Sequence, residues 1–113
     1  MDASQPTFFL THWVRDRGEF SIEEAVRLMT SDTADLFGIP GRGRLVPGSF
    51  ADVNVIDMEG LRLGYPEMAH DFPGGAGPFV QRADGYTATV VNGEVFMEDG
   101  EHSGALAGRM LRR

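Results

Sequence analysis

The sequence contains no cysteine. This absence excludes disulfide bonds, thiolate metal ligands and cysteine nucleophiles. Long apolar runs are also missing, whereas a helix needs roughly 20 apolar residues to span a bilayer. The opening stretch MDASQP lacks the basic-then-apolar pattern of a secretory signal. We therefore expect a cytoplasmic protein that has no membrane partner.

Basic side chains are outnumbered, with 10 Lys and Arg against 17 Asp and Glu and a formal net charge of −7. The arginines are scattered except for a small group at Arg109, Arg112 and Arg113. A nucleic-acid-binding surface needs a basic stripe or patch, so no nucleic-acid partner is expected. The 113 residues suffice for one modest core but not for a (β/α)₈ barrel, which takes roughly 250.

The first part of the chain, residues 1–40, is predicted to be helical. In residues 7–17, Trp13 follows Phe9 by four positions, which is a one-face helical spacing. Ser21 and Glu24 form a capping-box pattern for the next helix. The stretch 30–32 offers a second N-cap, and Gly38 followed by Pro40 predicts a helix stop.

The remainder, residues 41–113, is predicted to contain strands. Residues 52–57 alternate apolar and polar side chains, which indicates a short strand. Residues 86–91 and 94–98 flank Asn92-Gly93, a pair that favours a type I′ hairpin turn. Residues 60–85 are rich in glycine and proline, so we expect an irregular, mobile loop there. The fold class is therefore α+β: N-terminal helices followed by a small antiparallel β portion.

Histidine and carboxylate side chains are the usual ligands of a hydrolytic metal site, often at short spacings such as H-E-x-x-H. The three histidines, His12, His70 and His102, are far apart in sequence. His70 precedes Asp71, but the pair falls in the Gly/Pro-rich loop. We interpret these histidines as exposed loop or surface residues and predict no metal ligand in this chain.

Other candidate chemical groups also have ordinary structural interpretations. Gly48-Ser49 lacks the second glycine of a nucleophile elbow, and the glycine run 74–77 lacks the Gly-Lys-Ser/Thr of a phosphate loop. Each carboxylate pair is expected to lie at or near a helix N-terminus, where negative charge is favourable, and the aromatic stripe is expected to belong to the core. These groups are Glu23 with Glu24, Asp32 with Asp35, and Phe8, Phe9 and Trp13. The sequence thus predicts no catalytic and no cofactor-binding residue.

Several strings read together resemble the amidohydrolase superfamily. Residues 21–31, followed by Ala34 and residues 37–39, resemble its last barrel helix. Residues 41–57 resemble the pattern R-G-x-L-x-P-G-x-x-A-D followed by an apolar strand, with Asn54 in a position that is usually apolar. Residues 91–93 and 100–112 resemble the closing hairpin and tail of the N-acyl-D-amino-acid deacylases, or D-aminoacylases.

The resemblance implies the C-terminal part of a metal-dependent hydrolase. Residues 1–40 would correspond to the end of a (β/α)₈ barrel, and residues 41–113 to part of a β-sandwich. The family's zinc ligands and catalytic carboxylate would lie outside this chain, which alone is expected to be inactive. The segment from Thr7 to His12 is expected to lie nearest to the mouth of the absent site. Exposed sheet edges and apolar patches are expected where the rest of the parent would pack.

Three hypotheses remain open from the residues. The first is a scaffold segment whose parent hydrolyses the amide bond of N-acyl-D-amino acids. The second is a non-catalytic interaction module that binds a partner through exposed sheet edges, the partner being the missing barrel domain or a second copy. The third is an independent small enzyme, which the lack of a catalytic set disfavours.

Overall fold

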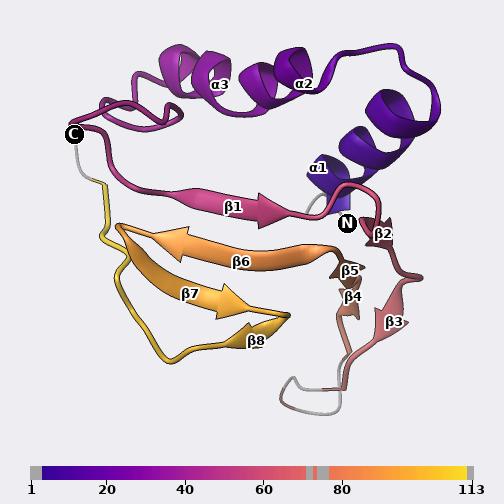
Figure 1. Cartoon of the computed structure of the whole chain (residues 1–113). Helices are drawn as coiled ribbons and strands as arrows, with labels where there is room; N and C mark the ends of the chain where they lie inside the picture. The colour runs from indigo at the N-terminus through magenta and orange to yellow at the C-terminus, as the bar shows by residue number, and fades with distance from the viewer. Residues whose placement is uncertain (1–3, 71–72, 74–76, 112–113) are drawn as a thin grey trace.

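Helices come first along the chain and strands follow, as Figure 1 shows. The computed structural model describes residues 4–70, 73 and 77–111. The helices are α1 (Gln5–Phe8), η2 (Phe9–Asp16), α2 (Ile22–Met29) and α3 (Ser31–Leu36). The strands after them pair in antiparallel fashion. The predicted α+β class is therefore confirmed.

The first helical segment changes its winding within a few residues. Pro6 stands in the first turn of α1, where its missing N–H removes no helical hydrogen bond. Beyond α1, η2 is a π-helix: the Arg17 N–H donates to the His12 carbonyl, five residues back, at 2.9 Å. Gly18 then takes φ +62°. The helix predicted over 7–17 is present, but most of it has this wider winding.

The predicted capping box opens α2. The Ser21 hydroxyl accepts from the Glu24 N–H at 3.2 Å, and the Glu24 carboxylate accepts from the Ser21 N–H at 3.1 Å. The second N-cap lies at Thr30, within the predicted stretch, but it lacks a side-chain capping bond. The Thr30 hydroxyl donates back to the Val26 carbonyl at 2.6 Å and makes no capping bond to α3. Gly38, at φ +62°, follows the end of α3 as expected.

The main sheet has the order β1-β6-β7-β8. Its strands are β1 (Val53–Ile56), β6 (Tyr86–Val91), β7 (Glu94–Glu98) and β8 (Glu101–His102). The turn between β6 and β7 places Asn92 at φ 50° and Gly93 at φ 83°. Both values are those of a type I′ turn, so the hairpin predicted from Asn-Gly is confirmed.

The Gly/Pro-rich stretch 60–85 is not wholly irregular, which corrects the sequence prediction. Its two limbs run antiparallel and form short ladders. These are β2 (Arg62–Leu63) with β5 (Ala83–Asp84), and β3 (Glu67–Met68) with β4 (Phe79–Val80). Further main-chain bonds join the limbs, such as Gly64 N–H to the Arg82 carbonyl at 2.8 Å. The tip of the stretch, including most of the glycine run 74–77, lies outside the described residues.

The small core lies where η2, α2 and the turn after β1 meet. Leu10, Ala25 and Leu61 are fully or almost fully buried there. Partly buried residues pack around them: Phe9, Val14, Met29, Ile56, Met58 and Tyr86. The prediction that the aromatic stripe belongs to the core holds for Phe9 alone, since Phe8 is 45% and Trp13 38% exposed.

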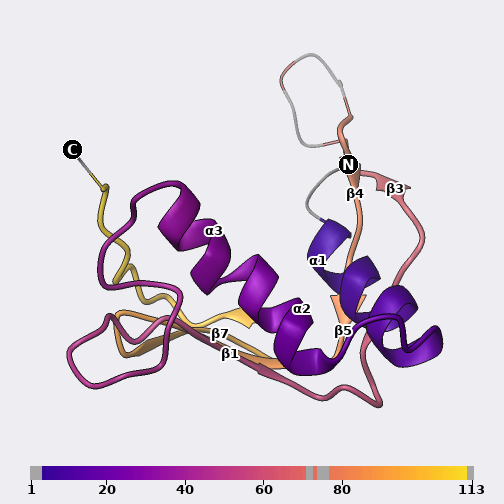
Figure 2. The same ribbon diagram turned by 90° about the horizontal axis from the view of Figure 1, so that it is seen from above.

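The main sheet has two unlike faces. Asn54, Thr89 and Met97 lie in register across three strands and share one face, because paired residues point the same way. The opposite face carries the row Val53, Val90 and Val95. Figure 2 shows α2 and α3 set to one side of this sheet. No helix of the described part of the chain is long and apolar enough to cross a membrane.

Candidate functional site

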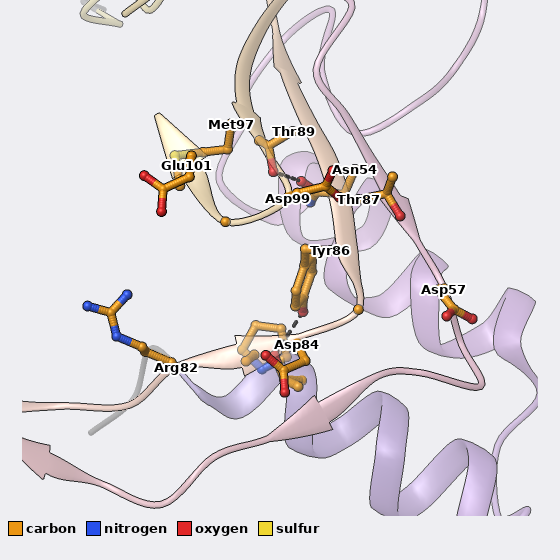
Figure 3. A pocket seen from close by; sticks show the side chains of 15 residues that line it. Asn54, Asp57, Arg82, Asp84, Tyr86, Thr87, Thr89, Met97, Asp99 and Glu101 are labelled. Atoms are coloured by element: carbon orange, nitrogen blue, oxygen red, sulfur yellow. Dashed lines mark hydrogen bonds between the residues drawn. The ribbon is translucent and has the colours of Figure 1, made fainter. Parts of the chain in front are cut away.

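An open hollow of about 890 Å³ lies beside the main sheet and the N-terminal end of α1. Figure 3 shows its side chains. Polar residues dominate the lining. The ionisable groups on its wall are Asp57, Arg82, Asp84, Tyr86, Asp99 and Glu101. The cavity therefore gathers charge from turns and strands that are distant in sequence.

Two side-chain hydrogen bonds organise the wall of this hollow. The Thr7 hydroxyl and the Tyr86 hydroxyl lie 2.8 Å apart and join α1 to β6. The Thr89 hydroxyl donates to the Asn54 side-chain carbonyl at 2.9 Å and joins β6 to β1. Thr7 is 4% exposed, so its hydroxyl is fixed in place. These bonds connect elements that are distant in sequence.

The carboxylates of the hollow do not converge. Figure 3 shows Asp57, Asp84 and Glu101 pointing in different directions from separate segments. Within residues 4–70, 73 and 77–111, no three His, Cys, Asp or Glu side chains are grouped so that they could hold a metal ion. The described residues therefore do not fit a metal centre, and the hollow has no arrangement typical of hydrolytic catalysis.

A second cavity of about 630 Å³ lies at the turn end of the β6–β7 hairpin, between Phe50 and Arg109. Its wall is held by a polar network. Arg42 pairs with Asp52 and also lies over the Phe50 ring, 4.2 Å from its centroid. Asp52 accepts from the Asn92 N–H at 2.9 Å. The network holds the hairpin turn against the segment before β1 and therefore stabilises the fold.

The three histidines occupy unrelated environments. The His12 ring stacks on Phe8 at 4.9 Å and meets Trp13 edge-on at 4.8 Å. His102 lies edge-on to Phe96 at 4.5 Å, and its Nδ1 accepts from the Gly104 N–H at 2.8 Å. His70 is exposed just after β3. Asp71, the neighbour of His70 in sequence, lies outside the described residues.

Of the carboxylates singled out in the sequence, those at positions 23, 24 and 32 lie in the first turn of a helix as predicted, whereas Asp35 lies near the C-terminal end of α3, which corrects the prediction for it. Hydrogen bonds from the Ser21 main chain and hydroxyl lower the pKa of Glu24. The bidentate Arg44 guanidinium, at 3.0 and 2.6 Å, lowers the pKa of Asp35. Asp32 pairs with Arg27 at 3.1 Å. None of these groups lines either cavity, so their electrostatics are structural.

Sequence reasoning did not single out the ionisable residues of the larger hollow. Arg82 precedes β5 and Asp84 belongs to it, whereas Asp99 lies in the turn before β8 and Glu101 belongs to that strand, and no known motif relates the two pairs. Of the segment expected near the mouth of an absent site, Thr7 lines the hollow. His12 stacks among the aromatic rings of the helix instead. Ser49 lines the second cavity, and its N–H bonds to the Val46 carbonyl at 3.1 Å in a turn.

The chain is similar in sequence to D-aminoacylase and to dihydroorotases. D-aminoacylase of Alcaligenes xylosoxydans xylosoxydans is 38% identical over 104 residues, which cover 92% of this chain and 20% of that protein. A dihydroorotase of Halalkalibacterium halodurans is 37% identical over 98 residues, covering 80% of this chain and 21% of its own length.

Solved structures of D-aminoacylase match with a TM-score of 0.75 at 35% identity, over 96% of this chain and 21% of theirs. One of these structures concerns the functional role of a binuclear metal centre in D-aminoacylase. The chain thus spans about a fifth of the length of these relatives. The sequence pattern of the amidohydrolase family matches residues 2–97, and the chain belongs to this family.

Proposed function

We propose that this chain forms the C-terminal scaffold of a metal-dependent amidohydrolase that hydrolyses the amide bond of N-acyl-D-amino acids. In that reaction water adds across the amide bond, and a carboxylic acid and a free D-amino acid leave. Residues 1–40 take the place of the last helices of a (β/α)₈ barrel. Residues 41–113 take the place of part of a β-sandwich.

The observation that carries this proposal is the match to D-aminoacylase along almost the whole chain. Both the sequence identity of 38% and the TM-score of 0.75 favour D-aminoacylase as the guide to activity. The dihydroorotase of H. halodurans matches a smaller share of the chain, 80% against 92%. The substrate class therefore follows the D-aminoacylase branch.

The catalytic groups that hydrolyse the amide bond are assigned to the part of the amidohydrolase that this chain does not span. Zinc is the metal that the family resemblance implies. The residues described here do not fit a binuclear metal centre, since no three potential ligands come together among them. The role of the chain is accordingly to support the barrel, and among its described residues we assign no catalytic, cofactor-binding or metal-ligating side chain.

A single-chain chimera tests the proposal. This chain replaces the matched fifth of the Alcaligenes D-aminoacylase, and release of free D-amino acid from an N-acyl-D-amino acid is measured. We expect kcat/KM within about tenfold of the parent enzyme, a difference of about 1.4 kcal/mol in transition-state stabilisation.

Two controls define the outcome of this experiment. The N-acyl-L-amino acid should be hydrolysed no better by the chimera than by the parent, and residues 1–113 alone should release no amino acid. A folded chimera without turnover would contradict the scaffold role, and turnover by residues 1–113 alone would contradict the absence of catalytic groups.

A second candidate function is favoured by a specific feature, the outer edge of β1, with which no other described strand pairs. A non-catalytic interaction module would use such an edge to bind a partner strand. This alternative predicts binding without any hydrolysis in the chimera.

A further inference from the structure

The turn of the β6–β7 hairpin consists of Asn92 and Gly93, a pair that is chemically labile. In a flexible chain, the main-chain nitrogen of the glycine attacks the side-chain carbonyl carbon, Cγ, of the preceding asparagine. Glycine has no side chain to hinder this approach, so Asn-Gly deamidates more readily than other asparagine pairs. The hairpin therefore carries a reactive pair at one end of the main sheet.

The reaction passes through a five-membered succinimide ring. The Gly93 nitrogen forms a bond to the Asn92 Cγ, the bond from Cγ to Nδ2 breaks, and Nδ2 leaves as ammonia with the proton that the Gly93 nitrogen gives up. Water then opens the ring at one of its two carbonyls, which gives aspartate or isoaspartate at position 92. The net change consumes one water and releases one ammonia, so water is the only co-reactant.

Hydrogen bonds hold both reacting groups in the folded chain. The Gly93 N–H, on the attacking nitrogen, donates to the Ala51 carbonyl at 2.9 Å. The Asn92 Nδ2, which is the leaving group, donates to the Ala107 carbonyl of the C-terminal tail, residues 103–111. Figure 1 shows this tail passing the end of the hairpin. Ring closure rotates the peptide between Asn92 and Gly93 out of its type I′ geometry, so both bonds must break first.

The side-chain carbonyl of Asn92 is also kept from activation. Its Oδ1 is buried and accepts no hydrogen bond from the part of the chain that the structure describes. A donor at this oxygen would draw electron density from Cγ and favour attack on it. The same side of the turn lines the second cavity together with Ala107 and Arg109, which gives water a route to the ring once the tail moves.

A second turn of the main sheet has the same backbone in a different environment. Asp99 and Gly100, between β7 and β8, have φ values of 47° and 83°, against 50° and 83° at Asn92 and Gly93. Asp99 is exposed, whereas Asn92 is half-buried. Nothing lies within 4 Å of a Cβ built at Gly100. The two turns thus differ in their surroundings and match in conformation.

The tail over Asn92 is held at a few points only. The Ser103 hydroxyl donates to the Val95 carbonyl at 2.5 Å and accepts from the Ala105 N–H at 3.2 Å, which fastens the start of the tail to β7. Further along, Leu106 and Met110 are 84% and 80% exposed. Segments with so few contacts open locally while the rest of the fold persists. Release of the tail is therefore an opening that frees the Asn92 side chain without unfolding the sheet.

We propose that Asn92 is a deamidation site that the C-terminal tail keeps closed, and that deamidation prevents the tail from docking again. The product carboxylate has no N–H to donate to the Ala107 carbonyl, and its oxygens repel that carbonyl. It also places charge where the Asn92 Oδ1 is buried. Isoaspartate in addition lengthens the main chain of the turn by one methylene. The modification thus makes a reversible opening permanent, independently of the proposed hydrolase function.

A variant with two Asn-Gly turns tests the closed state. Asp99→Asn places an asparagine before Gly100, and the full chain is incubated at mildly alkaline pH in buffer and in urea. Peptide mapping by mass spectrometry follows the loss of asparagine at positions 92 and 99. The rates in urea give the intrinsic reactivity of each pair. After division by these rates, we expect position 92 to react about tenfold or more slower than position 99 in the folded chain, because two hydrogen bonds must break.

Ser103→Ala in the same background tests the role of the tail. Loss of the hydroxyl that fastens the tail to β7 should raise the rate at position 92 several-fold and leave position 99 unchanged. Ser31→Ala is the control, because it removes a hydroxyl bonded within the helical segment, to the Arg27 carbonyl at 3.4 Å, and should change neither rate. Equal normalised rates at positions 92 and 99, or no response of position 92 to Ser103→Ala, would overturn the closure by the tail.

Asn92→Asp reproduces one product and tests whether the opening becomes permanent. Aspartate tolerates the left-handed backbone of this position almost as well as asparagine does, so the turn is retained. We expect the amides of residues 105–109 to exchange with solvent about tenfold faster in this variant than in the unmodified chain. Unchanged exchange of these amides would overturn the claim that deamidation prevents the tail from docking.

Discussion

At the scale of single residues, the ionisable groups with shifted pKa values hold helices and loops in place. Asp35 near the end of α3 receives both Nη atoms of Arg44 from the following loop. This bidentate geometry favours the charged carboxylate and lowers its pKa. The pair thereby fastens the loop 41–44 to α3 without any role in a cavity.

Asp35→Asn tests this pairing through its pH dependence. A carboxyl whose pKa is lower in the folded state stabilises the fold above its unfolded pKa, about 3.9, and loses that contribution as the pH falls through the folded value. The variant should therefore be less stable than wild type near neutral pH, and the difference should vanish in acid. Urea unfolding from pH 7 downward measures this difference. Glu59→Gln, at an exposed carboxylate without an ion pair in the described part of the chain, should show no such trend.

Gly85 is required by a close approach as well as by its backbone angle. It has φ +98°, and a Cβ there would lie 2.6 Å from the Leu61 Cα. Gly104 has a similar φ of +93°, with nothing within 4 Å of a Cβ. Both Gly→Ala variants incur left-handed strain, but Gly85→Ala also forces the main chain apart at the core.

We therefore expect Gly104→Ala to lower the free energy of unfolding by about 1 kcal/mol and Gly85→Ala by about 1–3 kcal/mol more. Denaturant unfolding of both variants gives the comparison. Equal losses would mean that the contact with Leu61 is not rigid.

At the scale of elements, local chemistry determined what could be predicted. The capping box of α2 and the Asn92-Gly93 hairpin were both predicted because each is decided by neighbouring residues. The ladders within 60–85 were missed because strands of two residues carry no alternation to detect. The larger hollow was missed because its charged residues meet only through the fold.

The N-cap of α2 gives a prediction at this scale. Ser21→Ala removes the acceptor for the Glu24 N–H and should lower the free energy of unfolding by about 1 kcal/mol. Ser21→Asp keeps an acceptor at the N-cap and should remain close to wild type. Urea unfolding monitored by circular dichroism measures both variants. An equal loss of unfolding free energy in the two variants would show that the side-chain oxygen at the N-cap does not stabilise α2.

At the scale of the whole molecule, the chain combines a very small core with a large open surface. Only Leu10, Ala25, Ala34 and Leu61 are buried apolar residues within the described part of the chain. Large apolar side chains such as Leu36, Leu45 and Tyr65 are mostly exposed, at 81%, 75% and 92%. This distribution is typical of a segment that packs against further protein, and it agrees with the one-fifth coverage of the relatives.

We propose that this chain supplies framework and binds no metal through its described residues. A zinc titration of the isotopically labelled chain, followed by its amide NMR spectrum, tests this most directly. The account predicts dispersed peaks that do not shift at stoichiometric zinc. Specific shifts that converge on His12, His70 or His102 at low zinc would show that the chain carries its own site and would contradict the scaffold role.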